Sequence, residues 1–194
     1  MKDLELRSDE ELVKLAVSRK VYPQVFKILV KRYLDPLYNF VHRHMNDEYL
    51  SQDIVQETFF ILYEKIDTFK NRSSFKTWLY QIARNTSLNK LKQKINYKED
   101  SLNKTIGSRE AGLTLDSTLK STDPLPEEQL AQKELAKRIE DVLGRLTGED
   151  REIIEMHYFD GLQYTEIAEI MGISSENVRI RAFRTLIELR EMME

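Results

Sequence analysis

Residues 163–181 read QYTEIAEIMGISSENVRIR, and this stretch decides the fold of the last third of the chain. Two short segments with helical apolar spacing are separated by Gly172, which is the pattern of two helices joined by a glycine turn. Ile173 and Val178 are spaced to fill the gap between these helices. The stretch therefore predicts a helix-turn-helix. Helical hairpins of this type also occur as plain packing units, but the arginines that follow favour DNA binding.

The second helix of this motif is predicted from Ser174 or Ser175 through Met193. Its apolar positions face inward and leave Glu176, Arg179, Ile180 and Phe183 on the opposite side, with Arg181 and Arg184 flanking them. We expect Arg179, near the helix N-terminus, to reach base edges. Arg181 and Arg184 are placed to contact phosphates.

A second unusual stretch lies upstream, where residues 68–98 read TFKNRSSFKTWLYQIARNTSLNKLKQKINYK. It holds eight Lys or Arg residues and no acid, in a chain that has 33 acids and 30 bases overall. It also contains five aromatic rings, namely Phe69, Phe75, Trp78, Tyr80 and Tyr97. Cationic side chains bind the phosphates of a nucleic-acid backbone, and aromatic rings stack on unpaired bases, so a surface that combines them suits a single-stranded nucleic acid. The alternative is a solvated basic helix that packs through its rings.

The helices of the front half follow from caps and apolar spacing. We expect a first helix from Ser8 to about Arg19. A long second helix is expected from Pro23 to about Met45, kinked or split near Leu34 by Pro36. A third helix, capped by Ser51, is expected to run to about Ile66. The basic stretch contributes a loop at residues 67–74 and a helix from Phe75 to about Gln93. Within the third helix Phe59 and Phe60 are adjacent, so one ring is expected to stay exposed beside acids as a partner surface, or both are half-buried.

The fold class predicted from these elements is all-α, with two small helical domains joined by a flexible linker. Residues 1–95 are expected to form the first domain, and residues 96–126 the linker. Residues 127–194 are expected to form a helix-turn-helix, winged-helix-like DNA-binding domain. Its first two helices are expected from Pro126 to about Leu143 and from Gly148 or Glu149 to about Phe159. No apolar run reaches the length of a membrane span, there is no signal peptide, and the chain has no cysteine. These features predict a cytoplasmic protein without membrane insertion.

Catalytic and metal chemistry are not favoured by the sequence. His42 and His44 are two residues apart on a helix and point in different directions, so they do not share a metal ion, and His157 stands alone. There is no glycine-rich phosphate loop and no nucleophile elbow. We therefore expect no catalytic residues, no metal and no cofactor.

Two blocks of this sequence, taken together, resemble the extracytoplasmic-function (ECF) branch of the bacterial sigma-70 family. The first is DIVQETF at residues 53–59, continued by FKTWLYQIARN at residues 75–85, and the second runs from Leu146 to the end of the helix-turn-helix. The resemblance implies a region 2 domain followed by a region 4 domain. It departs from the family pattern at Gln163, where Ser or Thr is usual, and at Ile180, where a small polar residue is common.

The resemblance implies three binding surfaces. The helix after Ser51 would dock on the β′ clamp of core RNA polymerase through Asp53, Gln56, Glu57, Phe59 and Phe60. Single-stranded −10 DNA would contact Phe69, Lys70, Asn71, Arg72, Ser73, Arg84, Asn85, Asn89 and Lys92, with a flipped base in a pocket lined by Asn85. Duplex −35 DNA would contact Ser175, Glu176, Arg179, Ile180, Arg181, Phe183 and Arg184.

The function implied is that of a sigma factor, which directs core polymerase to promoters and opens the DNA. Its partners would be core polymerase, through the β′ clamp and the β flap, and promoter DNA, and an anti-sigma factor is a further partner that the resemblance leaves open. The rival hypothesis is a self-sufficient dimeric repressor or activator with the same C-terminal motif and an N-terminal dimerisation or sensing domain. That hypothesis explains the last third of the chain but not the acid-free stretch.

Overall fold

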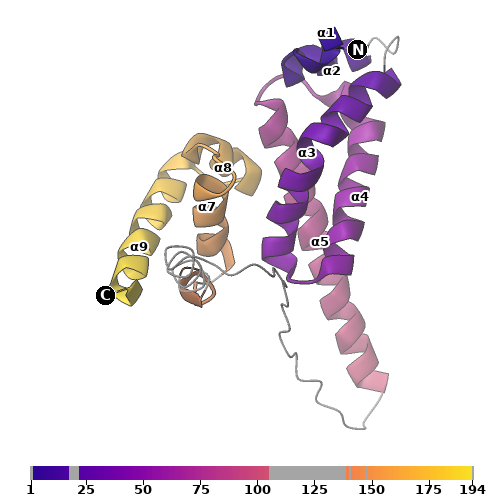
Figure 1. Cartoon of the computed structure of the whole chain (residues 1–194). Coiled ribbons are helices and arrows are strands. Elements are labelled where there is room, and N and C mark those ends of the chain that lie inside the picture. Colours follow the sequence, from indigo (N-terminus) through magenta and orange to yellow (C-terminus); the bar gives the residue numbers. More distant parts are fainter. Residues whose placement is uncertain (1, 18–21, 105–138, 140, 147, 194) are drawn as a thin grey trace, which may run out of the picture.

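The computed structural model describes residues 2–17, 22–104, 139, 141–146 and 148–193, and every regular element in these ranges is a helix. The elements are α1 (Lys2–Glu5), α2 (Asp9–Val17), α3 (Tyr22–Met45), α4 (Glu48–Lys65), the 3-10 turn η1 (Ile66–Thr68), α5 (Phe75–Lys104), α7 (Gly148–Tyr158), α8 (Tyr164–Met171) and α9 (Ser175–Met193). Figure 1 shows two groups of helices, α1–α5 and α7–α9, which meet where α8 lies against α5. The all-α prediction is confirmed for the described residues.

The first group is a bundle in which α3, α4 and α5 run side by side and α2 lies across one end (Figure 1). Its core contains the apolar stripes of all four helices, among them Leu12, Leu29, Phe40 and Leu62. Rings fill the space between α3 and the start of α5, where Phe75 lies 5.5 Å from Tyr33 and 5.9 Å from Phe69 between ring centroids. Ring packing of this kind stabilises a core beyond the area that it buries.

Local side-chain caps explain where two of these helices begin. The Ser8 hydroxyl accepts the Glu11 N–H at 3.2 Å and the Glu11 carboxylate accepts the Ser8 N–H at 3.1 Å, so the predicted start of α2 is confirmed. The prediction that Ser51 caps α4 was wrong. The helix α4 begins at Glu48, and its N-cap is Asp47, whose carboxylate accepts the Leu50 N–H. Ser51 is instead buried inside the helix and donates to the Asp47 carbonyl at 2.6 Å.

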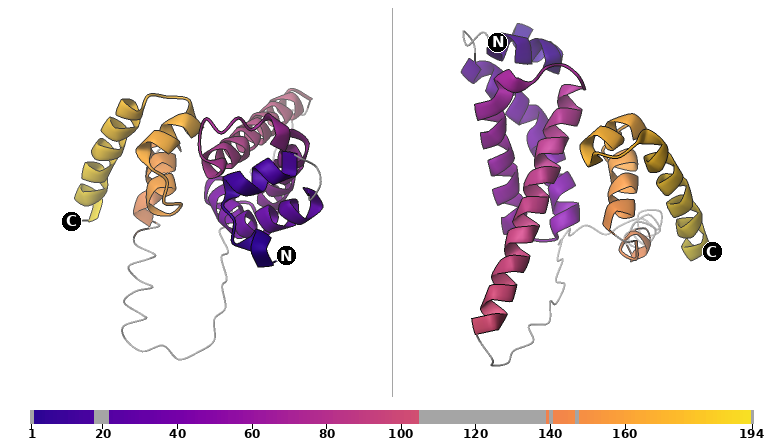
Figure 2. Two further views of the ribbon diagram at one scale, coloured as in Figure 1. Left: turned by 90° about the horizontal axis from the view of Figure 1, so that it is seen from above. Right: turned by 180° about the vertical axis from the view of Figure 1, so that it is seen from behind.

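Two helices are longer than the sequence predicted. The helix α3 continues through Pro36 as one element, so the predicted split near Leu34 does not occur. The helix α5 runs to Lys104, eleven residues past the predicted end at Gln93. Both views in Figure 2 and Figure 1 show the last turns of α5 projecting beyond α3 and α4. The first part of the predicted linker is therefore helical, and residues 105–126 lie outside the described part of the chain.

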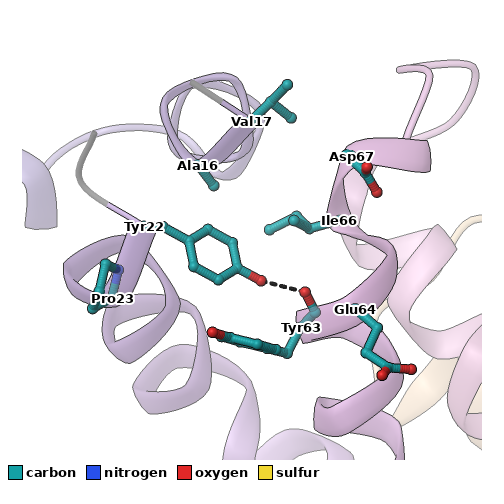
Figure 3. Close-up of a pocket in the computed structure, with 8 residues that line it drawn as sticks. All are labelled: Ala16, Val17, Tyr22, Pro23, Tyr63, Glu64, Ile66 and Asp67. Carbon is teal, nitrogen blue, oxygen red and sulfur yellow. Dashed lines mark hydrogen bonds between the residues drawn. The ribbon is translucent and has the colours of Figure 1, made fainter. Parts of the chain in front are cut away.

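A cavity of about 500 Å³ lies at the junction of α2, α3 and the end of α4. Figure 3 shows Tyr22 reaching across it, with its hydroxyl donating to the backbone carbonyl of Tyr63 and Ala16 and Ile66 on either side. The Tyr22 and Tyr63 rings are 4.9 Å apart between centroids. This contact ties the start of α3 to the end of α4.

The second group begins with a helical turn, of which residues 139 and 141–143 are described, and continues into α7, α8 and α9. The rest of the helix predicted from Pro126 lies outside the described residues. Gly172 closes α8 with a left-handed φ of 71°, a conformation that favours glycine, and its N–H bonds to the Ala168 carbonyl. The Ser174 hydroxyl accepts the Asn177 N–H at 3.2 Å and caps α9. The predicted helix-turn-helix is confirmed, and the described residues of this group contain no β wing.

Candidate nucleic-acid interface

The rings of the basic stretch lie mostly in the core of the bundle. Phe75 and Tyr80 are 0% and 1% exposed, Phe69 is 9% exposed, and Trp78 is partly buried against Phe69. Burial raises the pKa of the Tyr80 hydroxyl above its ordinary value. Phe69, Phe75 and Tyr80 are therefore not available for base stacking, and Trp78 is available only in part. The side chain of Tyr97 lies outside the described part. The expectation of an exposed cation-and-ring surface is corrected to an exposed cation-and-amide surface.

The loop before α5 presents its polar side chains to solvent. Lys70, Asn71 and Arg72 are exposed, and Ser73 is half-buried. Asn71 has a φ of 51°, in the left-handed region that Asn tolerates better than most residues. Phe69, which was predicted to contact DNA, instead anchors this loop in the core.

Along α5 the exposed polar positions recur on one side of the helix. Asn85, Asn89 and Lys92 are exposed and spaced by four and three residues, so they follow one another along one face. Arg84, which was predicted to join them, is buried, and its Nε donates to the Glu152 carboxylate at 2.7 Å. We call the exposed side chains of residues 70–72 together with Asn85, Asn89 and Lys92 the α5 face. It lacks three predicted members, because Phe69 and Arg84 are buried and Ser73 is half-buried.

The helix α4 presents an acidic surface with exposed rings. Phe60 is 60% exposed, whereas Phe59 is 8% exposed. The prediction that one of these adjacent rings is exposed to solvent is therefore confirmed, and the exposed ring is Phe60. Asp53 and Gln56 are exposed on the same side, and Glu57 is half-buried at its edge. The α4 face, defined by Asp53, Gln56 and Phe60, is an apolar ring among polar groups, as at the centre of many protein interfaces.

Sequence reasoning missed two further rings on this helix. Tyr49 is 85% exposed and Tyr63 is 51% exposed. Positions 49, 53, 56, 60 and 63 are separated by four and three residues, so all five lie on one side of α4. This spacing was readable in the sequence and would have added Tyr49 and Tyr63 to the candidate protein contacts.

Lys90 joins the two faces, because its ammonium group lies 2.7 Å from Asp53 and 2.9 Å from Glu57. The hydrogen bonds that Lys90 donates to the carboxylates of Asp53 and Glu57 raise its pKa above the ordinary value. Lys90 is therefore committed to α4 rather than presented to a nucleic acid with its neighbours on α5.

The outer side of α9 keeps most of the predicted duplex-binding residues exposed. Glu176, Arg179, Ile180, Phe183 and Arg184 are all exposed, and Ser175 is half-buried at the start of the helix. Phe183 is 67% exposed and adjoins the exposed side chain of Ile180, so the two form an apolar patch among the polar residues of this side. The α9 face is this set of five exposed residues.

Arg181 behaves differently from its neighbours on α9. Its guanidinium donates to Asp150 at 2.6 Å and to Glu149 at 2.5 Å, and both acids lie in the first turn of α7. These bonds raise the pKa of Arg181 above its ordinary value. The prediction that Arg181 meets phosphates is not supported by this geometry, because the side chain already holds α9 to α7.

The start of α5 contacts the second group through α8. One Glu166 carboxylate oxygen accepts the hydroxyls of Ser74 at 3.0 Å and Thr77 at 2.9 Å, and the Gln81 amide donates to the Glu169 carbonyl at 3.1 Å. Burial raises the pKa of Glu166, but the hydrogen bonds from Gln163, Thr77 and Ser74 outweigh it, so the net pKa is lowered. Glu166 is therefore ionised where it meets the first turn of α5.

Comparison with known protein families decides the family to which the chain belongs. Residues 29–95 match sigma-70 region 2, and residues 136–189 match sigma-70 region 4. The ECF RNA polymerase sigma factor SigW of Bacillus subtilis is 32% identical over 169 residues, which cover 87% of this chain and 88% of that protein. The chain belongs to the ECF sigma factors. The ECF RNA polymerase sigma-E factor of Haemophilus influenzae is likewise 32% identical over 190 residues, 95% of each chain.

Solved structures agree with the fold of this sigma factor. The structure of CnrH in complex with the cytosolic domain of CnrY matches with a TM-score of 0.64 at 23% identity, over 96% of this chain and 97% of that one. The sigma factor RpoE in complex with the anti-sigma factor NepR from Bartonella quintana matches with a TM-score of 0.61 at 21% identity, over 87% and 96%. The match to region 2 ends at residue 95, whereas α5 continues to Lys104.

None of the described helices of this sigma factor combines the length and the apolar character that crossing a membrane requires. The described residues also contain no group of three His, Cys, Asp or Glu side chains arranged to hold a metal ion.

Proposed function

We propose that this sigma factor binds core RNA polymerase through the α4 face, single-stranded promoter DNA through the α5 face and duplex promoter DNA through the α9 face. The observation that carries the proposal is the presence, in one chain, of a helix-turn-helix with exposed arginines and a separate bundle with an exposed acidic, ring-bearing helix. A self-sufficient dimeric repressor accounts for the helix-turn-helix but not for the acid-free stretch at residues 68–98 of the same chain. The chain would act in the cytoplasm, and the chemistry of RNA synthesis would belong to the polymerase.

On the α4 face, Phe60 is the central contact and Asp53 and Gln56 surround it. An exposed ring that becomes buried on binding is the type of residue that dominates interface energies. The carboxylate favours a basic partner surface, which in this proposal lies on the β′ clamp of the polymerase. Tyr49 and Tyr63 extend the contact along the helix.

On the α5 face, the mechanism is capture of one strand after a base leaves the stack. Unstacking a base costs a few kcal/mol, and contacts to the free base offset this cost selectively. Phe69, Phe75 and Tyr80 are buried, so in this proposal the main contacts come from amides and cations. Asn85 and Asn89 offer donors and acceptors to base edges, while Lys70, Arg72 and Lys92 meet phosphates.

On the α9 face, Arg179 lies in the first turns of the recognition helix and is free to enter the major groove. Arginine pairs with guanine in two-bonded geometry, which makes it the commonest specific contact in the groove. Arg184 is placed one turn further along, where a phosphate contact is expected. Phe183 supplies an apolar contact between them, for which a thymine methyl group is the natural partner.

Transcription in vitro with purified core polymerase on a promoter library tests the proposal. We expect specific initiation that depends on this protein, and loss of stable open complexes for Asn85→Ala with polymerase binding unchanged. Asn96→Ala, which changes an exposed asparagine three turns further along α5, is the matched control. Specific operator binding by the protein alone, with no polymerase-dependent transcription, would favour the repressor instead.

A further inference from the structure

The cavity beside Tyr22 and Tyr63 belongs to none of the three proposed binding faces. Its volume of about 500 Å³ falls within the range of pockets that proteins use to bind small molecules. Ala16 and Ile66 form its base and are 1% and 4% exposed, whereas Val17 and Tyr63 at its edge are 47% and 51% exposed. The cavity is therefore apolar and open to solvent, and its lining comes from α2, α3 and the junction of α4 with η1 (Figure 3).

A hydrogen bond and ring packing hold the cavity open. The Tyr22 hydroxyl donates to the Tyr63 carbonyl, which is among the last four carbonyls of α4, where a helix lacks partners of its own. The Tyr63 ring lies 4.9 Å from the Tyr22 ring and 5.3 Å from the Phe26 ring between centroids. Closing the cavity by rotation of Tyr22 would break this hydrogen bond and the contact between the two tyrosine rings. The free protein therefore presents a preformed cavity.

The edge of the cavity is acidic. Glu64 and Asp67 line it, and both are exposed. Neither carboxylate has a hydrogen bond or an ion pair with a described residue, and the described part of the lining contains no lysine or arginine. Figure 3 shows both carboxylates at the edge, away from the Tyr22 ring. An apolar interior with carboxylates at its edge fits an apolar side chain that has a cationic neighbour.

The cavity continues the α4 face. Tyr63 lies on the same side of α4 as Asp53 and Phe60, and its side chain also lines the cavity. About one helical turn, or about 5 Å, separates Phe60 from Tyr63, so a partner segment that covers Phe60 also reaches the cavity. Both surfaces combine apolar side chains with carboxylates. They therefore suit the same partner.

We propose that the cavity is a second anchor for core RNA polymerase, into which the polymerase segment that covers the α4 face inserts a large apolar side chain. A lysine or arginine beside that side chain meets Glu64 and Asp67 at the edge. The proposal rests on the proposed function of the α4 face, and it extends the polymerase contact to α2 and α3. A side chain that fills such a cavity at an interface is a typical hot spot, because water is excluded from it on binding.

Filling the cavity tests this anchor. Val17→Trp enlarges an exposed side chain at the edge of the cavity, whereas Leu34→Trp places the same ring at a 45% exposed position on α3, about three turns beyond Tyr22. Titration of the labelled protein with core polymerase measures both variants, and circular dichroism verifies that they fold. We expect Val17→Trp to bind at least about tenfold more weakly than wild type, and Leu34→Trp to bind as wild type does. Equal affinities of the two variants would overturn the proposal.

Neutralising one acid tests the charge at the edge without a change of size. Asp67→Asn removes a carboxylate from the edge, and Asp35→Asn makes the identical change at an exposed acid of α3 that does not line this cavity. We expect Asp67→Asn to weaken binding to core polymerase by about threefold at low ionic strength and by less at high ionic strength, because salt screens exposed charges. Asp35→Asn should bind normally. Unchanged binding by Asp67→Asn would contradict the cationic neighbour even if Val17→Trp failed to fold.

A segment of the chain itself is the alternative occupant. Arg19 and Lys20 follow Val17 closely in the sequence and lie outside the described residues. If they supplied the counter-charge, Asp67→Asn would lower the free energy of unfolding and leave the affinity for core polymerase unchanged. Denaturant unfolding and the binding titration together reveal that outcome, and it would overturn the proposal.

The Phe60→Ala variant separates this proposal from the one beneath it. Normal binding of Phe60→Ala to core polymerase would mean that the α4 face itself has been wrongly assigned. If Phe60→Ala binds weakly but Val17→Trp and Asp67→Asn bind as wild type does, the α4 face stands and the cavity is not an anchor.

Discussion

The helices α4 and α5 are neighbours in one bundle, and both carry predicted binding residues, yet they differ in what covers them. On α4 the acids and the Phe60 ring are open to solvent, and Lys90 is the one described cation that reaches them. On α5 the first turns lie under α8, and Arg84 and Thr77 are bonded to carboxylates of the other half. The α4 face is therefore open along its length, whereas on α5 the residues open to solvent lie beside first turns that the C-terminal half covers.

The largest expected effect concerns the rings at the start of α5, which we assign to the core and not to DNA. Phe75→Ala removes a fully buried ring that contacts Tyr33 and Trp78, and it should lower the free energy of unfolding by about 3–5 kcal/mol. Denaturant unfolding followed by circular dichroism measures this. Phe60→Ala, on the open α4 face, is the control and should change stability by no more than about 0.5 kcal/mol. A stable Phe75→Ala protein that has lost single-strand binding would mean that the ring faces DNA.

The next effect concerns binding of α4. Phe60→Ala should weaken binding to core polymerase by about 2 kcal/mol, because a ring at the centre of an interface is a typical hot spot. Titration of labelled protein with core enzyme measures the loss. Leu34→Ala, which truncates a 45% exposed side chain on α3, is the matched control and should bind normally. If both variants bind alike, the α4 face is not the polymerase contact.

The contrast between an open and an occupied side chain recurs within α9, at two arginines two residues apart. Arg179→Ala should lower affinity for duplex promoter DNA by about 1–3 kcal/mol, as expected for a base-contacting arginine. Arg181→Ala should mainly weaken the packing of α9 on α7, since its guanidinium is bonded to Glu149 and Asp150. Binding isotherms and thermal unfolding of both variants distinguish the two roles. The assignment is reversed if Arg181→Ala loses DNA affinity and Arg179→Ala does not.

Much of this architecture could be predicted from the sequence where a local signal sets it. Three local signals predicted their elements correctly: the Ser8 cap, the Gly172 turn and the apolar spacing of α7 to α9. Each of them depends only on residues within a few positions of one another. The start of α4 was misplaced for a local reason too. Both Asp47 and Ser51 suit a cap, and only the structure shows that Ser51 bonds back to the helix carbonyl four residues earlier.

The features that could not be predicted depend on distant partners. Arg84 is buried because Glu152, 68 residues away in the sequence, supplies its counter-charge. The rings of residues 69–80 could face inward or outward, and their burial was decided by α3, which provides Tyr33 and Phe40 as neighbours. The extension of α5 past Gln93 could not be predicted from apolar spacing, because this part of the helix has no buried apolar stripe and residues 92–96 are all exposed.

The smallest expected effect tests Lys90, the cation that joins α5 to α4. Lys90→Met should lower the free energy of unfolding by about 0.2–1 kcal/mol, because Asp53 and Glu57 are more than a third exposed and water screens the pairs. Folding raises the pKa of Lys90, so its contribution is fully present below the unfolded pKa, near 10.5, and is lost as the pH rises through the higher folded pKa. The stability difference between wild type and Lys90→Met should therefore be constant from pH 7 to 9 and shrink above pH 10.5. Lys65→Met, at the exposed end of α4, should show no such trend. A difference that is absent at pH 7 would mean that Lys90 is free of α4, and that it belongs with Lys92 on the face that binds DNA.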